Sequence, residues 1–246
     1  MIFLFTDFGH RASYVGQMRA VLERTAPGGA VVELTAFAPA FEPRPAAYLL
    51  AAEGRIARPG DVVLAVVDPG VGTERAPLAA LVDGVWFVGP DNGLLALVAR
   101  RARSVAWHRI DWRPEHLSAT FHGRDLFAPV AARLARGDAS GLVPSAPTTN
   151  TDGWPDDLDA VVFVDDYGNA MTGRRAATLP HDAVVLAGCH RFAAGRTFAD
   201  DGRRRGFWYE NAIGLVELAV REGSAAATFG LAVGTPVTLA PPGPNP

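Results

Sequence analysis

Residues 61–67 form an almost purely apolar run, and this run restricts the fold more than any other feature of the sequence. A strand has this composition when both faces of its sheet are covered, as in parallel α/β sheets. Residues 2–5 predict an earlier strand, and residues 14–22 then place apolar side chains at helical spacing. The pair Asp83-Gly84 between two apolar runs predicts a hairpin. Strands that alternate with helices predict an α/β domain with a mostly parallel sheet.

The chain divides into two predicted domains of different kinds. The alternation of strands and helices defines an N-terminal α/β domain over residues 1–140. Residues 141–157 are rich in Gly, Ser, Thr, Pro and Asp, so we expect a linker there. Short strands separated by glycine turns, one of them at residues 226–229, predict a smaller β-barrel-like C-terminal domain over residues 158–246.

The composition excludes several classes of partner. The formal net charge is −3 and every basic residue is Arg, so we interpret local arginine runs as solvated surface and expect no nucleic acid partner. No apolar run is long enough to span a bilayer, and the N-terminus does not resemble a signal peptide, so no membrane partner is expected. The single cysteine, Cys189, cannot form an internal disulfide, which predicts a cytoplasmic protein.

Asp68 begins a turn-forming segment, residues 68–75, directly after the long apolar run. Two glycines allow its backbone to approach a ligand closely, and Arg75 can fold back on Asp68. Taken alone, this pattern fits an ion pair that holds a loop equally well. Asp7 also lies just past a predicted strand. Ligands bind beyond the carboxyl ends of strands in such sheets, so we expect Asp7 and Asp68 to share one site.

Three further segments carry residues suited to a site. His122 precedes a helix predicted at residues 124–136, where ligand-facing side chains are common, although a lone histidine is more often structural. Residues 163–172 combine acids, an aromatic residue, Gly and Asn after a strand, and could equally form a simple turn. The aromatic residues 207–209 beside Asn211 fit either a small aromatic core or a surface that stacks a purine.

Six motifs, in order along the chain, resemble the S-adenosyl-L-methionine hydroxide adenosyltransferase family, also known as the S-adenosylmethionine-dependent fluorinase and chlorinase family. The motifs are Thr-Asp-Phe-Gly at residues 6–9, Val-Val-Asp-Pro-Gly-Val-Gly at 66–72, Gly-Pro-Asp-Asn-Gly-Leu-Leu at 89–95, Thr-Phe-His-Gly-Arg-Asp at 120–125, Asp-Asp-Tyr-Gly-Asn at 165–169 and Asn-Ala-Ile-Gly-Leu-Val-Glu at 211–217. The resemblance implies an α/β N-terminal domain, a β C-terminal domain and a homotrimer. It also implies active sites between the N-terminal domain of one subunit and the C-terminal domain of the next.

The resemblance implies a reaction as well. Family members attack the ribose 5′-carbon of S-adenosyl-L-methionine, which is their substrate, and release methionine without a cofactor or a metal. The hydrolytic branch uses an Asp, Arg and His set that matches Asp68, Arg75 and His122. The halogenating branch has Tyr in place of the Asp and Ser at the position of Gly123. The resemblance thus favours hydrolysis to adenosine and L-methionine. The alternatives are transfer of a halide, and a non-catalytic protein that binds adenosine or S-adenosylmethionine.

Contacts to the substrate follow from the same resemblance. Asp7 matches a residue that holds the ribose hydroxyls, Phe41 an aromatic near the ribose, and Asp165 a residue that binds the methionine amino group. Ala212 and Gly173 depart from the family, which often has Ser and Asn there. The residues expected to bind the substrate are Asp7, Phe41, Phe121, Asp165, Tyr167, Asn169, Trp208 and Asn211.

Overall fold

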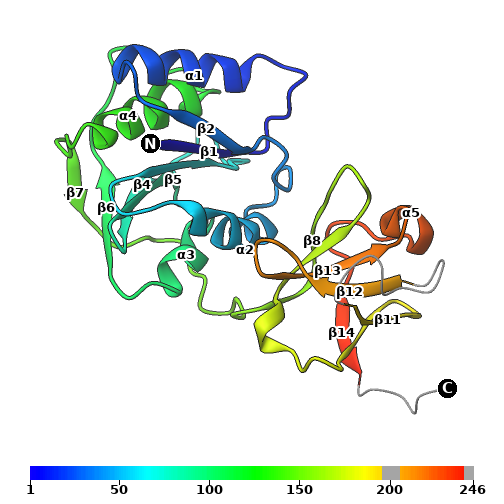
Figure 1. Ribbon diagram of the computed structural model, residues 1–246. Helices are drawn as coiled ribbons and strands as arrows, with labels where there is room; N and C mark the ends of the chain where they lie inside the picture. Colours follow the sequence, from blue (N-terminus) through cyan, green and yellow to red (C-terminus); the bar gives the residue numbers. More distant parts are fainter. Residues whose placement is uncertain (196–205, 241–246) are drawn as a thin grey trace. The chain divides into compact units, whose positions relative to one another are not determined.

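The computed structural model of the chain describes residues 1–195 and 206–240. It contains two compact units, Met1–Gly153 and Trp154–Pro246, each with its own seven-stranded sheet (Figure 1). The first unit is an α/β structure and the second is rich in strands, which confirms the predicted fold class. Within the described ranges, no helix is both long enough and apolar enough to cross a membrane.

The first sheet is mixed and has the strand order β2-β1-β3-β5-β4-β6-β7. The first four strands in this order pair in parallel, and the remaining pairs are antiparallel. The antiparallel pair β4 and β5 confirms the hairpin predicted at Asp83-Gly84. Strand β7 lies inside the segment predicted to be a linker, residues 141–157, and extends the first sheet into it. The strands are β1 (Ile2–Thr6), β2 (Val31–Thr35), β3 (Val62–Val66), β4 (Pro77–Val82), β5 (Val85–Pro90), β6 (Val105–Ile110) and β7 (Leu142–Pro144).

Helices cover both faces of this sheet, as the apolar run of residues 61–67 predicts. Helices α1 (Tyr14–Thr25) and α4 (Ala128–Ala135) lie on one face, and α2 (Pro43–Glu53) and α3 (Ala96–Arg100) lie on the other (Figure 1). A 3₁₀ turn, Gly54–Ile56, follows α2. Strand β3, which is buried along its whole length, lies inside the parallel part of the sheet, so its carboxyl end is held firmly.

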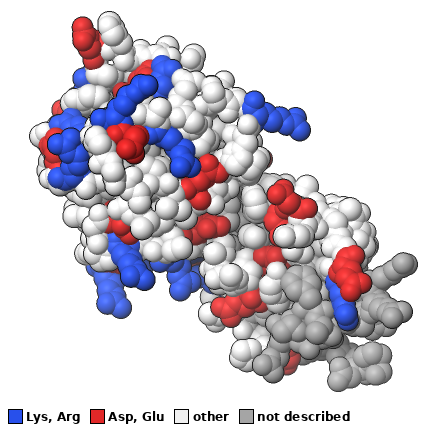
Figure 2. All heavy atoms as spheres, turned by 45° about the horizontal axis from the view of Figure 1, so that its top comes forward, with Lys and Arg blue, Asp and Glu red and all other residues white. Residues whose placement is uncertain are grey.

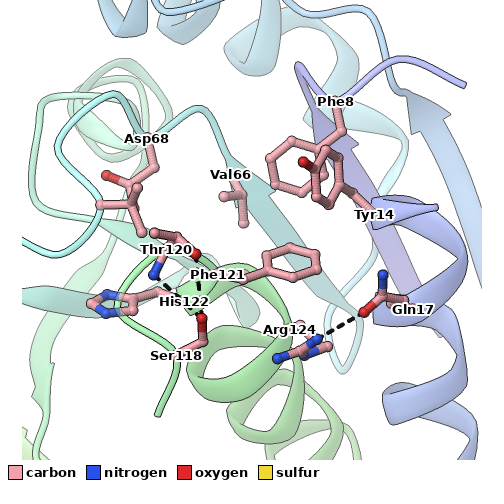
Figure 3. Close-up of a pocket in the computed structure, with 12 residues that line it drawn as sticks. Phe8, Tyr14, Gln17, Val66, Asp68, Ser118, Thr120, Phe121, His122 and Arg124 are labelled. Carbon is pink, nitrogen blue, oxygen red and sulfur yellow. Dashed lines mark hydrogen bonds between the residues drawn. The ribbon is translucent and has the colours of Figure 1, made fainter. Parts of the chain in front are cut away.

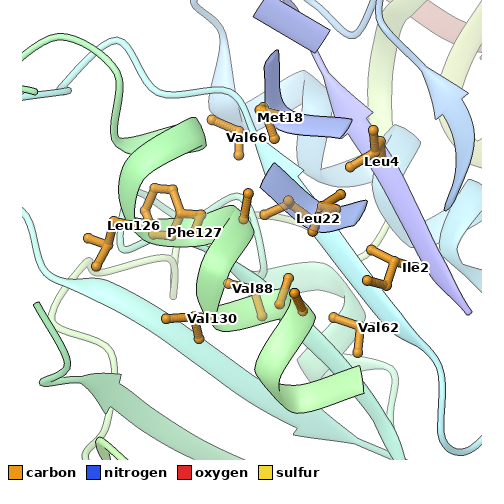
Figure 4. Packing of buried hydrophobic residues seen from close by; sticks show 14 of the residues in the cluster. Ile2, Leu4, Met18, Leu22, Val62, Val66, Val88, Leu126, Phe127 and Val130 are labelled. Atoms are coloured by element: carbon orange, nitrogen blue, oxygen red, sulfur yellow. The ribbon is translucent and has the colours of Figure 1, made fainter. Parts of the chain in front are cut away.

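The core between the sheet and helices α1 and α4 is built from alternate strand residues. Ile2 and Leu4 of β1 point toward the helices and pack among Met18, Leu22 and Phe127 (Figure 4). These side chains are almost fully buried. Burial of a large aliphatic or aromatic side chain contributes roughly 1.5–3 kcal/mol, so this layer fixes the strands whose ends carry Asp7 and Asp68.

The helix predicted at residues 124–136 has an irregular first turn. Residues Gly123–Phe127 form a π-helix, in which the amide of Ala128 donates to the carbonyl of Gly123, five residues earlier. The α-helical part, α4, begins only at Ala128. The wider turn follows His122 directly, and such turns are frequent at functional sites.

The second unit contains a nearly closed, barrel-shaped sheet with the order β14-β10-β11-β12-β13-β9-β8. An antiparallel bridge between Ala160 and Pro236 links the two edges of this sheet. The pair β11 and β12 is parallel, and the other pairs are antiparallel. Its elements are β8 (Leu158–Val164), β9 (Ala170–Arg175), a 3₁₀ turn (Ala176–Thr178), β10 (Val184–Ala187), β11 (His190–Ala194), β12 (Gly206–Glu210), β13 (Leu215–Val220), α5 (Ala225–Phe229) and β14 (Val237–Ala240).

The strand predicted at residues 226–229 is wrong, because Ala225–Phe229 forms the short helix α5. The Ser224 side chain caps it by accepting a hydrogen bond from the amide of Ala227, and Gly230 ends it with a left-handed φ of 64°. The alanines of this segment favour a helix once both ends are capped.

Arginine side chains at the surface are mixed with carboxylates rather than gathered into one basic patch (Figure 2). Many of them form ion pairs with a nearby aspartate in the same unit, as in Arg109–Asp111, Arg133–Asp138, Arg174–Asp159 and Arg175–Asp157.

Candidate active site

The segment after β3 folds back on itself and joins Asp68 to Arg75. Two turns make this reversal, with the amide of Val71 donating to the Asp68 carbonyl at 3.2 Å and that of Thr73 to the Gly70 carbonyl at 3.1 Å. Arg75 then donates from Nε to Asp68 Oδ1 at 2.8 Å and from Nη2 to Asp68 Oδ2. The two side chains are only 9% and 5% exposed, so the ion pair is shielded from water.

His122 is held by the same guanidinium. Arg75 Nη2 lies 3.0 Å from His122 Nδ1. A guanidinium can only donate, so Nδ1 accepts, and a neutral His122 carries its proton on Nε2. Burial, and then the positive charge of Arg75, lower the pKa of His122, so the neutral ring is favoured. The three residues predicted to be catalytic are therefore brought together by the structure, with Arg75 between the other two.

Gly72 lets the Asp68 segment approach the chain that carries His122. Its φ is +80°, and a Cβ at this position would lie 2.5 Å from the carbonyl oxygen of Ala119. No side chain fits in that space without displacing backbone. The glycine therefore fixes the separation of the two segments that supply Asp68 and His122.

A cavity of about 310 Å³ opens beside Asp68 and His122 (Figure 3). It lies at the carboxyl ends of β1 and β3, where the sequence places a ligand site. Asp68 and His122 lie on one side, and the aromatic rings lie on the other together with Gln17 and Arg124. Its lining consists of Phe8, Tyr14, Gln17, Val66, Asp68, Val71, Ser118, Thr120, Phe121, His122, Gly123 and Arg124.

Asp7 and Phe41 lie together, as expected. The amide of Phe41 donates to Asp7 Oδ2 at 3.1 Å, and Phe41 has a left-handed φ of 61° with its ring largely exposed. Burial raises the pKa of Asp7, and the nearby charge of Asp68 raises it further. The two carboxyl groups therefore influence each other at one edge of the sheet. Phe121 is buried in the cavity wall.

The second unit has its own cavity, of about 640 Å³, which contains three of the predicted residues. Its lining consists of Asp165, Tyr167, Asn169, Tyr209, Glu217, Val220, Glu222, Gly223 and Ser224. Asp165 Oδ1 accepts hydrogen bonds from the amides of Tyr167 and Asn169 at 3.0 and 2.8 Å. Asp165 Oδ2 accepts from the side chain of Asn169 at 3.1 Å. The turn alternative for this segment is thus also correct, and the turn presents its carboxylate to a cavity.

Tyr209 and Glu217 line this cavity although the sequence did not single them out. The Tyr209 hydroxyl donates to Glu217 Oε1, and the Asn211 side chain donates to Glu217 Oε2 at 2.8 Å. Glu217 is only 2% exposed, and burial raises its pKa. Burial and the Glu217 carboxylate also raise the pKa of Tyr209. A carboxyl group with two donors can remain buried at moderate cost, so these residues form one hydrogen-bonded unit.

Trp208 is a further residue predicted to bind the substrate, and its side chain does not line this cavity. It is buried in the core of the second unit, and its Nε1 donates to the Ala183 carbonyl at 2.8 Å. Side chains alternate along a strand, so Tyr209 and Trp208 of β12 necessarily face opposite sides. Assigning strand alternation to residues 206–210 would have selected Tyr209 in place of Trp208.

Asn211 also has a structural function within its own turn. Its Oδ1 accepts hydrogen bonds from the amides of Ile213 and Leu215 at 3.1 and 2.9 Å. Its side chain contacts Glu217 but is absent from the cavity lining. Asn211 therefore adjoins the cavity through its hydrogen bond to Glu217, and the substrate contact predicted for it stays a prediction.

Comparison with known protein families and proteins covers both units. The SAM hydroxide adenosyltransferase N-terminal domain matches residues 2–143, and the C-terminal domain of the same family matches residues 159–238. A relative from Thermus thermophilus named (R)-S-adenosyl-L-methionine hydrolase is 40% identical, over 97% of this chain and 98% of its own. One of the same name from Salinispora arenicola is 38% identical, over 90% of both chains.

Solved structures share the whole architecture. An uncharacterized conserved protein from Thermotoga maritima superposes with a TM-score of 0.86 at 28% identity, covering 98% of this chain and 100% of its own. A conserved hypothetical protein from Thermus thermophilus has a TM-score of 0.76 at 37% identity, covering 97% of this chain and 99% of its own.

Proposed function

Because the chain belongs to the SAM hydroxide adenosyltransferase family, we propose that it hydrolyses S-adenosyl-L-methionine to adenosine and L-methionine. The observation that carries the proposal is the buried Asp68–Arg75 ion pair, with His122 against it, beside a cavity of the first unit. Relatives that align with almost the whole chain are named (R)-S-adenosyl-L-methionine hydrolase, so we propose the R sulfonium epimer as the preferred substrate.

The reaction is a displacement at a primary carbon. A water oxygen forms a bond to the ribose 5′-carbon while the bond from that carbon to sulfur breaks on the opposite side. The electron pair stays on sulfur, which leaves as the neutral thioether of methionine, so no acid is needed for departure. The water must lose a proton, and its pKa in bulk is about 15.7. No metal or organic cofactor is required for these steps, because the sulfonium supplies the activated leaving group.

The hydrogen bonds of the set support a role for each residue in this proposal. His122 Nδ1 accepts from Arg75, so its Nε2–H is the group left to donate to the attacking water. Asp68 is the acceptor for the water proton, because each of its oxygens keeps a free lone pair beside Arg75. Arg75 holds both partners in place and balances the carboxylate charge. General-base help of this kind contributes about 10²–10⁴-fold, and positioning supplies the remainder.

Transfer of a halide is the less favoured reaction on this scaffold. A halide would need donors around it, and Gly123 offers no side-chain donor. A Cβ at Gly123 would lie 3.3 Å from both Met18 Sδ and the Phe121 ring, and 3.4 Å from the Phe8 ring. A serine would therefore have to displace at least one of these side chains. The packing around Gly123 supports water as the nucleophile.

The cavity of the second unit provides the remaining substrate contacts in this proposal. Asp165 offers a carboxylate to the methionine amino group, and Tyr167 and Asn169 lie beside it. We also propose a homotrimer in which the first unit of one subunit and the second unit of a neighbour complete each active site. The single cysteine supports a cytoplasmic location. Sedimentation or light scattering of the purified chain tests the trimer.

Incubation with S-adenosyl-L-methionine tests the function directly. We expect equal amounts of adenosine and methionine to appear by chromatography, unchanged by chelators and by the choice of halide. A nucleoside product that forms only with chloride or fluoride would show that the protein transfers a halide and does not hydrolyse the substrate. Tight binding of S-adenosylmethionine without any product would favour a sensor. Parallel incubations with the separated R and S epimers test the stereochemical part.

A further inference from the structure

Three aromatic rings form a wall on the cavity of the first unit, and the reaction steps described above do not use them. The ring centroids of Phe8 and Tyr14 lie 5.6 Å apart, those of Phe8 and Phe121 lie 5.8 Å apart, and those of Tyr14 and Phe121 lie 5.2 Å apart. Both contacts with Phe121 are edge-to-face, with interplanar angles of 78° and 79°. Such packing holds the rings firmly while leaving parts of their π-faces open.

The wall lies across the cavity from the polar residues. Figure 3 shows Asp68 and His122 on one side, Phe8 and Tyr14 on the other, and Phe121 between them. In-line displacement places the leaving sulfur on the side of the 5′-carbon opposite the attacking water. With the water held by Asp68 and His122, the sulfonium points toward the aromatic side.

We infer that Phe8, Tyr14 and Phe121 recognise the positively charged sulfonium of the substrate through their ring faces. This inference rests on the proposed function, because it takes S-adenosyl-L-methionine as the ligand. The negative face of an aromatic ring attracts a cation within about 6 Å of its centroid, as in the aromatic sites that bind quaternary ammonium groups. A sulfonium with its methyl group is a cation of the same soft, weakly hydrated kind.

Exposure and charge indicate which rings are free to act. Tyr14 is 46% exposed, so its ring remains open to a ligand. Phe121 already has the Arg124 guanidinium 5.1 Å from its centroid. That guanidinium is paired with both oxygens of Asp125, at 2.6 and 2.9 Å, which offsets its charge. Tyr14 and Phe8 therefore contribute most to recognition of a second cation, with Phe121 as their support.

The charge on sulfur disappears during the reaction, and this gives the wall a distinctive kinetic signature. An interaction with the sulfonium is strongest in the bound substrate and weaker in the transition state. Such an interaction lowers KM without raising kcat. The wall should therefore bind the substrate more tightly than it binds methionine, the neutral thioether product. This difference in affinity helps methionine to leave.

The experiment compares S-adenosyl-L-methionine with S-adenosylhomocysteine, whose sulfur is neutral. Binding of both is measured by calorimetry for the Asp68→Asn protein and for the same protein with Tyr14→Leu, Phe8→Leu or Tyr14→Phe. Each Leu variant should weaken binding of S-adenosylmethionine by about two- to fivefold and leave S-adenosylhomocysteine unchanged. Tyr14→Phe keeps the ring and should keep the preference. In the background with Asp68 intact, the Leu variants should raise KM without lowering kcat.

Equal weakening of both ligands in the Leu variants would overturn the inference, since it would show simple packing. A loss of kcat at unchanged KM would also overturn it. Circular dichroism shows whether Tyr14→Leu alters the fold. If it does, Phe8→Leu provides an independent test. The test does not depend on turnover: a wild-type protein that released no adenosine would contradict the proposed function, while the ratio of the two affinities would still decide this inference.

Discussion

The cavities of the two units differ in the chemistry that their walls offer. The cavity of the first unit is lined by the carboxylate of Asp68 and the imidazole of His122, which both contact the Arg75 guanidinium behind them, and by three aromatic rings. The cavity of the second unit contains the carboxyl groups of Asp165 and Glu217 and the hydroxyl of Tyr209, with no arginine among its lining residues. The first arrangement is suited to position and deprotonate a water, whereas the second offers hydrogen-bonding groups and carboxylates that can hold a ligand or attract a cation.

From this difference we propose that the chemical step takes place in the first unit and that the second unit contributes to substrate recognition. A substitution in the Asp68–Arg75–His122 set should change the rate of the chemical step. A substitution in the second cavity should change substrate affinity and leave that rate almost unaltered. The following experiments test this division, beginning with the largest expected effect.

Asp68→Asn should lower kcat for adenosine release by about 10²–10⁴-fold, because it removes the proton acceptor but keeps the shape of the side chain. Adenosine is quantified by chromatography. Glu74→Gln, in the same segment and exposed to solvent, is the matched control and should retain the wild-type rate. A normal kcat for the Asp68→Asn protein would contradict the proposal that the chemical step takes place in the first cavity.

Gly72→Ala should lower kcat by up to about 10²-fold, since a shift of about 1 Å in a catalytic group can have that effect. The new methyl group would meet the Ala119 carbonyl and push Asp68 away from His122. Gly70→Ala, two residues earlier, is the control, because the nearest atom to its Cβ would be 3.4 Å away. Equal losses in the two variants would show that the loop tolerates no alanine at all, and would contradict this account of Gly72.

Acidification should inactivate the enzyme only below the ordinary pKa of histidine, about 6.5. Burial and Arg75 lower the pKa of His122, so the ring stays neutral as pH falls through that value. Once it is protonated, Nδ1 carries a proton and can no longer accept from Arg75. The profile of kcat/KM against pH should therefore be flat near pH 6.5 and then approach a tenfold loss per pH unit. A midpoint above 6.5 would show that the ring functions in another environment.

Neighbouring substitutions in β12 give the smallest effects and separate the two faces of the strand. Tyr209→Phe removes a hydroxyl from the cavity and should raise KM by about three- to tenfold, the value of one hydrogen bond, with kcat unchanged. Trp208→Phe should instead lower the free energy of unfolding by about 1–3 kcal/mol, because the Ala183 carbonyl loses its donor. Thermal or denaturant unfolding measures the second effect. If KM rose in Trp208→Phe and not in Tyr209→Phe, the result would indicate that Trp208, and not Tyr209, contacts the substrate.

The sequence predicts the first unit better than the second, for physical reasons. Asp7 and Asp68 follow apolar strands that are buried on both sides, and parallel strand ends must converge at one edge of a sheet. Arg75 lies close in sequence to Asp68, so their ion pair depends only on the conformation of a short segment. The hydrogen bond from Arg75 to His122 spans distant segments, and only the family resemblance suggested it beforehand.

The sequences of the short strands in the second unit predict less about which side chains face the core. A strand of about five residues does not show its register clearly, and a shift of one residue exchanges its two faces. The sequence of β12 therefore did not show that Trp208 faces the core while Tyr209 faces a cavity. Helix α5 was missed because its caps, Ser224 and Gly230, lie outside the apolar segment itself. Tyr14 was assigned to a helix face by its spacing, which cannot reveal that its ring also borders a cavity.

The π-helical turn at Gly123–Phe127 makes the site unusually sensitive to chain length. An α-helix advances by about 100° per residue, so deletion of one residue from this turn would allow regular α-helical bonding and rotate the preceding residues by that angle. His122 would then turn away from Arg75, while α4 could keep its place on the sheet. Deletion of a single residue from this turn is thus expected to give a protein that folds but is inactive. Chains that preserve the reaction are expected to preserve the length of this turn even where its residues vary.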